Sequence, residues 1–251
     1  MIEFRRLILT LSHGAADPAM MREAASLARL LNAELHALFV EDEAVTRASA
    51  LPFVREISPL SLQWRKLDPE RLAAEFRGAA EHARRHLVDA ARAVGVRQHF
   101  AAHRGDVALL VRETCVASDI VVVGAPGGTG GVRALPRFAE IAEASVAAVL
   151  YLPPNVPRAR GSVAAVVTDA NDPALAVARA IAALGHERLL VLSANETGVD
   201  DTVRLPAAAG VTDIVSALDQ TRERLIVLTR DGACVVAREL AAARGVPVLV
   251  I

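Results

Sequence analysis

The most constraining feature of this sequence is an apolar run that ends in a cluster of glycines. The run Asp119–Val123 consists mostly of β-branched residues, and five of the eight positions from 124 to 131 are glycine. A continuous apolar run of this kind is typical of a buried parallel strand. Glycines directly after a strand let the backbone turn sharply and bring N–H groups close to an anion. The sequence therefore predicts a parallel sheet with a candidate phosphate-binding turn at residues 124–131.

Strands and helices alternate along the first part of the chain. Strands are predicted at residues 7–11, 34–40, 98–103, 120–123 and 147–152. Helices are predicted to begin at Asp17-Pro18 and at Asp68-Pro69, because each pair combines a capping side chain with proline at the first helical position. This alternation predicts an α/β fold with a mostly parallel sheet and helices on both of its faces.

The end of the chain repeats this order in shortened form. Asp172-Pro173 stands 155 positions after Asp17-Pro18, and strands are predicted at residues 163–167, 188–193, 225–228 and 248–251. The long second helix and the glycine cluster have no counterpart there. We therefore predict two open parallel-sheet α/β sandwich domains, at residues 1–153 and 161–251, the second one reduced. Residues 154–160, which are rich in proline and arginine, are predicted to link them.

The composition excludes several kinds of function. The net charge of −1 argues against binding to nucleic acid or to an anionic membrane through charge. Lys66 is the only lysine, so the chain has no Gly-Lys-Ser/Thr phosphate loop. Neither a signal peptide nor an apolar stretch of about 18 residues is present, which predicts a cytoplasmic protein with no membrane partner. Cys115 and Cys234 are predicted to be buried, reduced thiols.

The first half resembles a domain of the universal stress protein family. The matching features are the strand, turn and helix at residues 7–31, the helix entry at Arg104–Asp106, and the strand with its glycines at 119–131. The likeness covers nearly all of residues 5–152 and, more weakly, 161–251, as in tandem members of that family. It implies an adenine nucleotide alpha hydrolase-like sandwich and a role in the stress response. In many members it also implies ATP at the carboxyl ends of the first and fourth strands, where open α/β sheets commonly bind ligands.

The ATP-binding pattern of that family is only partly present. Gly124 and Gly127 match its first two glycines, but Arg137 and Phe138 stand where it has a glycine followed by serine or threonine. Ser12 replaces the aspartate that follows the first strand. Arg137 could instead contact a phosphate directly. We therefore do not favour ATP or another nucleotide as the cofactor. The candidate ligand-binding residues are Ser12, His13, His103, Gly124, Gly127, Gly128, Gly130, Gly131 and Arg137.

No catalytic or metal-binding signature accompanies these residues. His82 and His86 share a helix face, but two histidines without a third ligand do not form a metal site. The leading hypothesis is a non-enzymatic cytoplasmic stress-response protein that binds a small ligand or a partner. One alternative is an ATP-binding or other nucleotide-binding protein with weak ATPase activity that uses the 124–131 loop. Another is an interaction scaffold without a ligand.

Two segments are candidates for interactions. The apolar strands Val149–Leu152 and Val248–Ile251 should each lie at a sheet edge, so we predict that they pair with one another within the chain; homodimer formation is the alternative. Residues 41–67 form an insertion that contains Phe53, Leu60, Leu62 and Trp64. These apolar side chains either cap the core of the first domain or form a lid or partner surface.

Overall fold

The computed structural model describes residues 3–12, 17–49, 51, 53–57, 62–124, 142–153, 160–230 and 233–251. In the first half, the strands are β1 (Arg6–Ser12), β2 (Glu34–Asp42), β3 (Arg55–Ile57), β4 (Trp64–Lys66), β5 (Gln98–Gly105), β6 (Asp119–Gly124) and β7 (Ala148–Leu152). The helices of this half are α1 (Pro18–Leu30), α2 (Glu43–Ser49), α3 (Pro69–Val94) and α4 (Val107–Thr114). The second half has strands β8 (Ser162–Val167), β9 (Leu189–Ser193), β10 (Thr202–Arg204), β11 (Glu223–Leu228) and β12 (Val248–Val250), with helices α6 (Pro173–Gly185), α7 (Val211–Ala217) and α8 (Ala233–Arg244).

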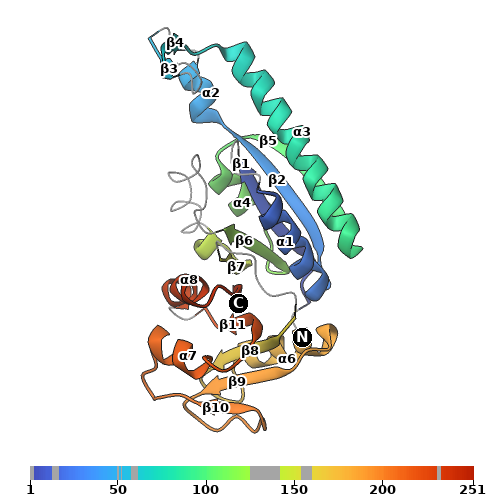
Figure 1. The fold of residues 1–251 in the computed structure, drawn as a ribbon, viewed down its shortest axis with the longest axis vertical. Helices are drawn as coiled ribbons and strands as arrows, with labels where there is room; N and C mark the ends of the chain where they lie inside the picture. The colour runs from blue at the N-terminus through green and yellow to red at the C-terminus, as the bar shows by residue number, and fades with distance from the viewer. Residues whose placement is uncertain are drawn as a thin grey trace.

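One sheet runs through both halves of the elongated molecule (Figure 1). Among the described residues it has ten strands, in the order β10-β9-β8-β11-β12-β7-β6-β1-β2-β5. Each half contributes its main-sheet strands in the same order. From the centre outwards this order is β7, β6, β1, β2, β5 in the first half and β12, β11, β8, β9, β10 in the second. Neighbouring strands are parallel within each half, whereas β7 and β12 pair antiparallel at the centre, with Leu150 opposite Leu249. The predicted α/β fold with a mostly parallel sheet is confirmed.

Three helices begin where the sequence places their caps. The carboxylates of Asp17, Asp68 and Asp172 each accept a hydrogen bond from the backbone N–H two residues further on, at 2.8, 3.0 and 3.0 Å. Each is followed by proline at the start of the helix. Helix α3 ends at Gly95, whose φ of 71° lies in the left-handed region that glycine adopts at low cost. Local sequence signals therefore determine these helix ends.

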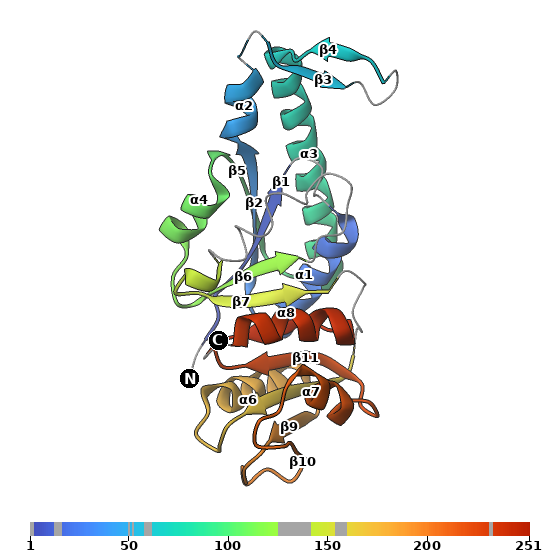
Figure 2. The same ribbon diagram turned by 90° about the vertical axis from the view of Figure 1, so that its left-hand side faces the viewer.

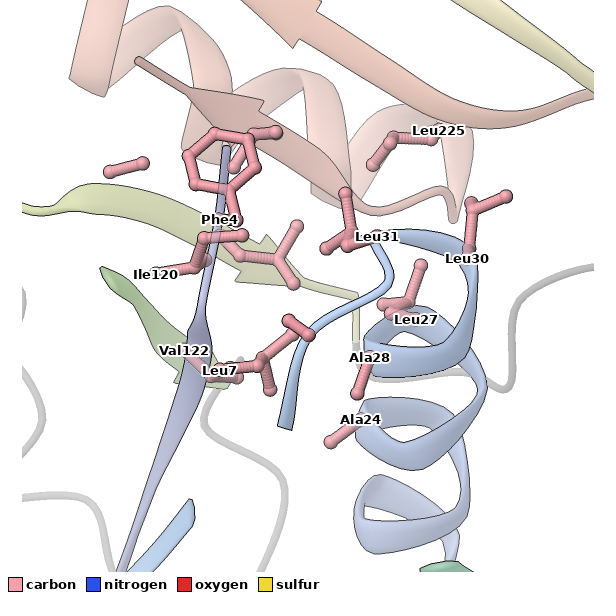
Figure 3. Close-up of a cluster of buried hydrophobic side chains, with 14 of the residues drawn as sticks. Phe4, Leu7, Ala24, Leu27, Ala28, Leu30, Leu31, Ile120, Val122 and Leu225 are labelled. Carbon is pink, nitrogen blue, oxygen red and sulfur yellow. The ribbon is translucent and has the colours of Figure 1, made fainter. Parts of the chain in front are cut away.

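A hydrophobic cluster crosses the boundary between the halves. Figure 3 shows Leu30 and Leu31 at the end of α1 lying towards Leu225 of β11, and these side chains belong to one buried cluster. Helix α6 approaches α1 closely at Gly185, where a Cβ would lie only 2.5 Å from Cδ1 of Leu30. Glycine permits this approach. The halves therefore share a core on this face of the sheet.

Two parts of the structure, the insertion and strand β10, differ from the sequence-based expectations. The insertion contains α2 and the two-stranded β3–β4 hairpin, at the end of the molecule remote from the second half (Figure 2). Phe53, Leu62 and Trp64 are exposed there, so the interpretation that they cap the core is wrong. Leu60 lies outside the described residues. Strand β10 was not predicted, because a three-residue strand carries almost no periodicity.

Candidate functional site

The candidate ligand site lies at the carboxyl ends of β1 and β6, which are neighbours in the sheet. Strand β1 ends at Ser12, of which the structure describes only the backbone, and β6 ends at Gly124. A Cβ on Gly124 would lie 2.9 Å from Sδ of Met20, so glycine lets the first turn of α1 lie close to the end of β6. The strand ends and the start of α1 therefore meet at this edge.

The structure places His103 at the same edge but apart from the glycine. His103 lies on the outermost strand β5 and pairs with Val40, which in turn pairs with Ser12. With about 4.8 Å between adjacent strands, the backbones of His103 and Ser12 are roughly 10 Å apart. Strands β1 and β2 also separate His103 from Gly124. The other predicted site residues, His13, Gly127, Gly128, Gly130, Gly131 and Arg137, lie outside the described residues.

The corresponding edge of the second half is closed by a bridge of polar side chains. Oδ1 of Asp172 accepts hydrogen bonds from the backbone N–H of Ala174, at 3.0 Å, and from the hydroxyl of Thr229. Its Oδ2 accepts from the backbone N–H and the hydroxyl of Thr168, at 2.9 and 3.1 Å. Burial alone would raise the pKa of Asp172, but the hydrogen bonds from Thr229 and Thr168 outweigh burial and lower it. The bridge joins the end of β11 to the start of α6.

The first half has no such bridge among its described residues. Gly124 follows the apolar residues of β6 as Thr229 follows those of β11, and Asp17 caps α1 as Asp172 caps α6. Glycine has no side chain that could reach Asp17. Asp172 is buried, whereas Asp17 is exposed. In the described part of the chain the carboxylate of Asp17 accepts a hydrogen bond only from the backbone N–H of Ala19, in the first turn of its own helix. In the part of the chain that the structure describes, the site of the second half is therefore bridged, and Asp17 and Gly124 form no such bridge in the first half.

The residue after Thr229 fastens the two halves together. The guanidinium of Arg230 donates to three backbone carbonyls that precede β7: those of Glu143 at 3.3 Å, Ser145 at 2.5 Å, and Ala147. The hydroxyl of Tyr151 on β7 donates to the Glu143 carboxylate at 2.5 Å, and burial together with this carboxylate raises the pKa of Tyr151. At the position where the first half has its glycine cluster, the second half thus has a contact between the halves.

Sequence reasoning missed Thr229 and Arg230 as structural residues. Asp172 was identified only as a helix cap. The available signal was the Thr229-Arg230 pair at the place of the glycine cluster, directly after a predicted strand.

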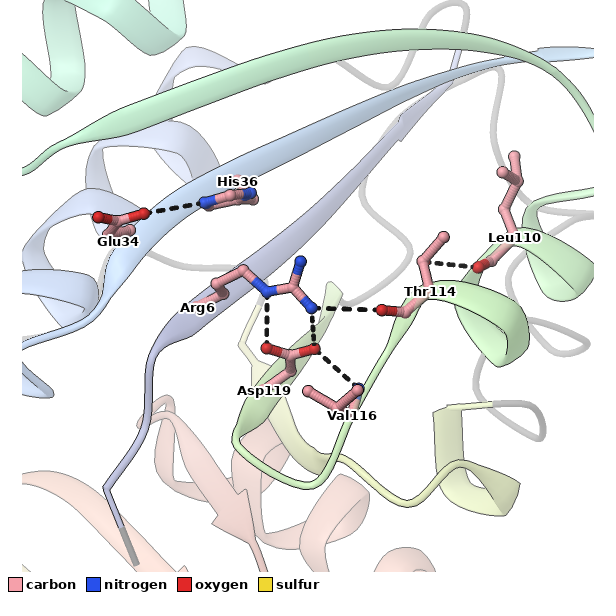
Figure 4. Close-up of polar contacts among 7 residues, drawn as sticks. All are labelled: Arg6, Glu34, His36, Leu110, Thr114, Val116 and Asp119. Carbon is pink, nitrogen blue, oxygen red and sulfur yellow. Dashed lines mark hydrogen bonds and ion pairs between the residues drawn. The ribbon is translucent and has the colours of Figure 1, made fainter.

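A second polar cluster lies at the opposite end of β6 and positions that strand (Figure 4). Asp119 is fully buried and accepts from Nε and Nη2 of Arg6, at 2.8 and 2.6 Å, and from the N–H of Val116. The second half repeats this arrangement, since the buried Glu223 at the start of β11 accepts from Nε of Arg244 at 2.8 Å. Because protein donors occupy these carboxylates, we assign both clusters a structural role.

The described residues contain no group of three or more His, Cys, Asp or Glu side chains that could hold a metal ion. The rings of His82 and His86 are 4.5 Å apart on α3. Cys115 is buried, and burial raises its pKa to about 11; Cys234 is only half-buried, so full burial was a wrong prediction for this residue. None of the described helices is both long and apolar enough to cross a membrane.

The fold is that of the universal stress proteins. A universal stress protein from Archaeoglobus fulgidus aligns with a TM-score of 0.67 at 14% identity, over 100% of this chain and 97% of that one. A putative universal stress protein from Pseudomonas aeruginosa UCBPP-PA14 aligns with a TM-score of 0.55 at 14% identity, over 99% and 93% of the two chains. A functionally unknown protein from Pseudomonas aeruginosa PAO1 aligns with a TM-score of 0.56 at 13% identity, over 99% and 92%.

The resemblance predicted from the sequence is thus confirmed for the fold. No protein-family model matches the sequence, and no curated protein matches it.

Proposed function

We propose that this chain is a non-enzymatic, cytoplasmic stress-response protein that binds one small ligand at the carboxyl ends of β1 and β6. The contrast between the two halves carries this proposal. In the second half the side chains of Thr229 and Asp172 bridge the strand end and the helix start, whereas Gly124 has no side chain for such a bridge and lies against Met20. Binding in open α/β sheets commonly takes place at this edge. We therefore expect one ligand per chain, held by the first half.

The sequence around this site supports an anionic ligand. Glycines after β6 can present backbone N–H groups, and Arg137 supplies a guanidinium that suits a phosphate or carboxylate. Arg137 and Phe138 replace the glycine and hydroxyl that ATP-binding relatives have, which disfavours intact ATP. The alternative function is ATP or nucleotide binding with weak ATPase activity at this loop.

The test combines identification of co-purified small molecules by mass spectrometry with thermal stabilisation by ATP, ADP, AMP, cyclic nucleotides and inorganic phosphate. A bound ligand at a hundred times its dissociation constant should stabilise the fold by about 2.7 kcal/mol. Gly124→Thr, which introduces the residue that stands at the second site and must displace the Met20 side chain, should abolish this stabilisation while circular dichroism shows that the variant folds. Thr229→Val, the matched control, should retain it.

Three outcomes decide between the functions. Stabilisation lost only in Gly124→Thr supports the proposal. Hydrolysis of ATP by the wild type, absent in Gly124→Thr, would establish the nucleotide alternative. The absence of any co-purified molecule and of any thermal shift would overturn ligand binding and leave partner binding as the role.

A further inference from the structure

The β3–β4 hairpin stands apart from the main sheet. In the described residues its two strands pair only with each other, with Ile57 opposite Trp64 and Glu56 opposite Arg65. Figure 2 shows it projecting at the end of the long axis, beyond α2 and the start of α3. An isolated two-stranded hairpin is marginally stable in water and gains stability when one face packs against another element. The next question is therefore which face of the hairpin packs against the rest of the molecule.

The charged face of the hairpin is the one that contacts α3. Glu56 accepts from Nε of Arg65 at 2.5 Å and from the guanidinium of Arg71, which belongs to α3. Because side chains alternate along a strand, Ile57 and Trp64 lie on the other face, together with Arg55 and the strand position opposite it, Lys66. The usual arrangement, with the apolar face packed and the charged face in water, is thus reversed.

The apolar side chains of this region are strongly exposed. The exposed fractions are 75% for Phe53, 50% for Ile57, 77% for Leu62 and 64% for Trp64. Arg55 is exposed beside them, and no carboxylate pairs with it among the residues that the structure describes. These five residues are here named the hairpin surface. Exposed apolar clusters mark interaction sites, and tryptophan and arginine are enriched among the residues that dominate binding energy.

We propose that the hairpin surface docks an apolar peptide segment of another protein that carries carboxylates. Apolar side chains of the segment would cover Ile57 and Trp64, and a carboxylate would pair with Arg55. The charge on this face specifies the partner, since a carboxylate beside Arg55 is attracted and a cation is repelled.

The charges also argue against two other occupants. Antiparallel pairing of β3 or β4 with its own copy, centred on the middle residue, would set Glu56 against Glu56 or Arg65 against Arg65. Recognition of an anionic bilayer takes a cluster of about 4–8 cations. The hairpin face in question has two cationic positions, Arg55 and Lys66, and Arg65 and Arg71 already pair with Glu56.

Trp64, the only tryptophan of the chain, reports directly on this surface through its fluorescence. The test titrates the full chain with a synthetic peptide of alternating leucine and glutamate, with a leucine–lysine peptide, and with phosphatidylserine-containing vesicles. We expect a saturable blue shift of Trp64 emission with the leucine–glutamate peptide alone. Fluorescence anisotropy of the labelled peptide then gives its affinity for each variant.

Arg55→Glu and Ile57→Ser should each weaken peptide binding by about tenfold, the loss expected for one central contact. Leu184→Ser, at a similarly exposed leucine on α6 of the second half, should leave it unchanged. Circular dichroism verifies that the variants fold. Equal binding of both peptides, a shift with vesicles alone, or a shift that grows with protein concentration as dimers form would each overturn the proposal.

Discussion

At the scale of single residues, Glu23 has an unusual environment for a carboxylate. It lies buried on α1 at the contact with the second half, near Arg224 of β11. Burial raises the pKa of Glu23 to about 7, and the charge of Arg224 only partly opposes this shift. The guanidinium of Arg224 donates to the hydroxyl of Ser26 at 2.9 Å and lies 3.8 Å from Glu187. A proton on Glu23 is therefore favoured by folding.

The stability of the protein should fall as Glu23 ionises. The folded pKa of about 7 lies above the ordinary value of 4.5, so this contribution is fully present below the ordinary value and is lost as the pH rises to 7. Between about pH 5.5 and pH 8, urea unfolding should show a loss of about 2 kcal/mol in the wild type that Glu23→Gln lacks. Glu81→Gln, at an exposed glutamate, serves as the control. Parallel pH profiles for Glu23→Gln and the wild type would contradict this assignment.

The two homologously placed helix caps offer a matched comparison. Asp172→Ala should cost about 2–4 kcal/mol, because it removes a buried cap and leaves Thr168 and Thr229 without their acceptor. Asp17→Ala removes an exposed cap alone and should cost about 1 kcal/mol. Chemical denaturation of both variants measures the difference. Equal losses would mean that the Thr229–Asp172 bridge contributes nothing.

At the scale of elements, β6 and β11 are each anchored at their start by a buried carboxylate. Asp119 is paired with Arg6 from β1, and Glu223 with Arg244 from α8. Arg6 also donates to the carbonyl of Thr114 at 3.2 Å, and Arg244 to that of Leu218 at 2.8 Å. Each arginine thus ties the strand to the end of the helix before it. The same structural solution uses donors from different elements in the two halves.

The two partners of the Arg6–Asp119 pair should tolerate loss differently. Arg6→Met leaves the carboxylate of Asp119 fully buried without its guanidinium and should cost about 3–5 kcal/mol. Asp119→Asn should cost less, because the Arg6 side chain is 34% exposed and its charge can be solvated. Urea unfolding of both variants tests this order, and the reverse order would show that the arginine, rather than the carboxylate, is the group that needs its partner.

At the scale of the whole molecule, the halves are joined by sheet pairing, by a shared core and by polar contacts. Strands β7 and β12 pair, Leu225 belongs to the same cluster as the end of α1, and Arg230 binds carbonyls before β7. Each of these contacts joins one half to the other. We infer that the second half stabilises the first by covering its apolar edge strand.

Unfolding should therefore be one cooperative event. Calorimetry should show a single transition whose van't Hoff enthalpy equals the calorimetric enthalpy. Leu249→Asp, which introduces a charge opposite Leu150 at the centre of the sheet, should lower the midpoint of that one transition. Two resolved transitions would instead support the division into independently folding domains at residues 1–153 and 161–251.

Much of the fold could be predicted because its signals are local. Apolar runs placed most strands, and Asp-Pro pairs placed the starts of α1, α3 and α6 within the sequence itself. The run that ends at Gly124 pointed to a candidate site after β6, and the family resemblance implied that the site also involves the end of β1. Its completeness did not follow, since the glycine cluster and Arg137 have no local pattern that shows what they contact.

The sequence by itself determined the α/β class, the capped helices and the end of strand β6 near Gly124. Only the tertiary structure decided that the site of the second half is bridged, because Thr229 meets Asp172 across 57 positions of the chain. It also decided that Glu23 is buried beside the second half and that Trp64 is exposed. The physical reason is that helix caps and strand runs act over a few residues, whereas burial, pKa and bridging depend on partners that only the assembled sheet brings together.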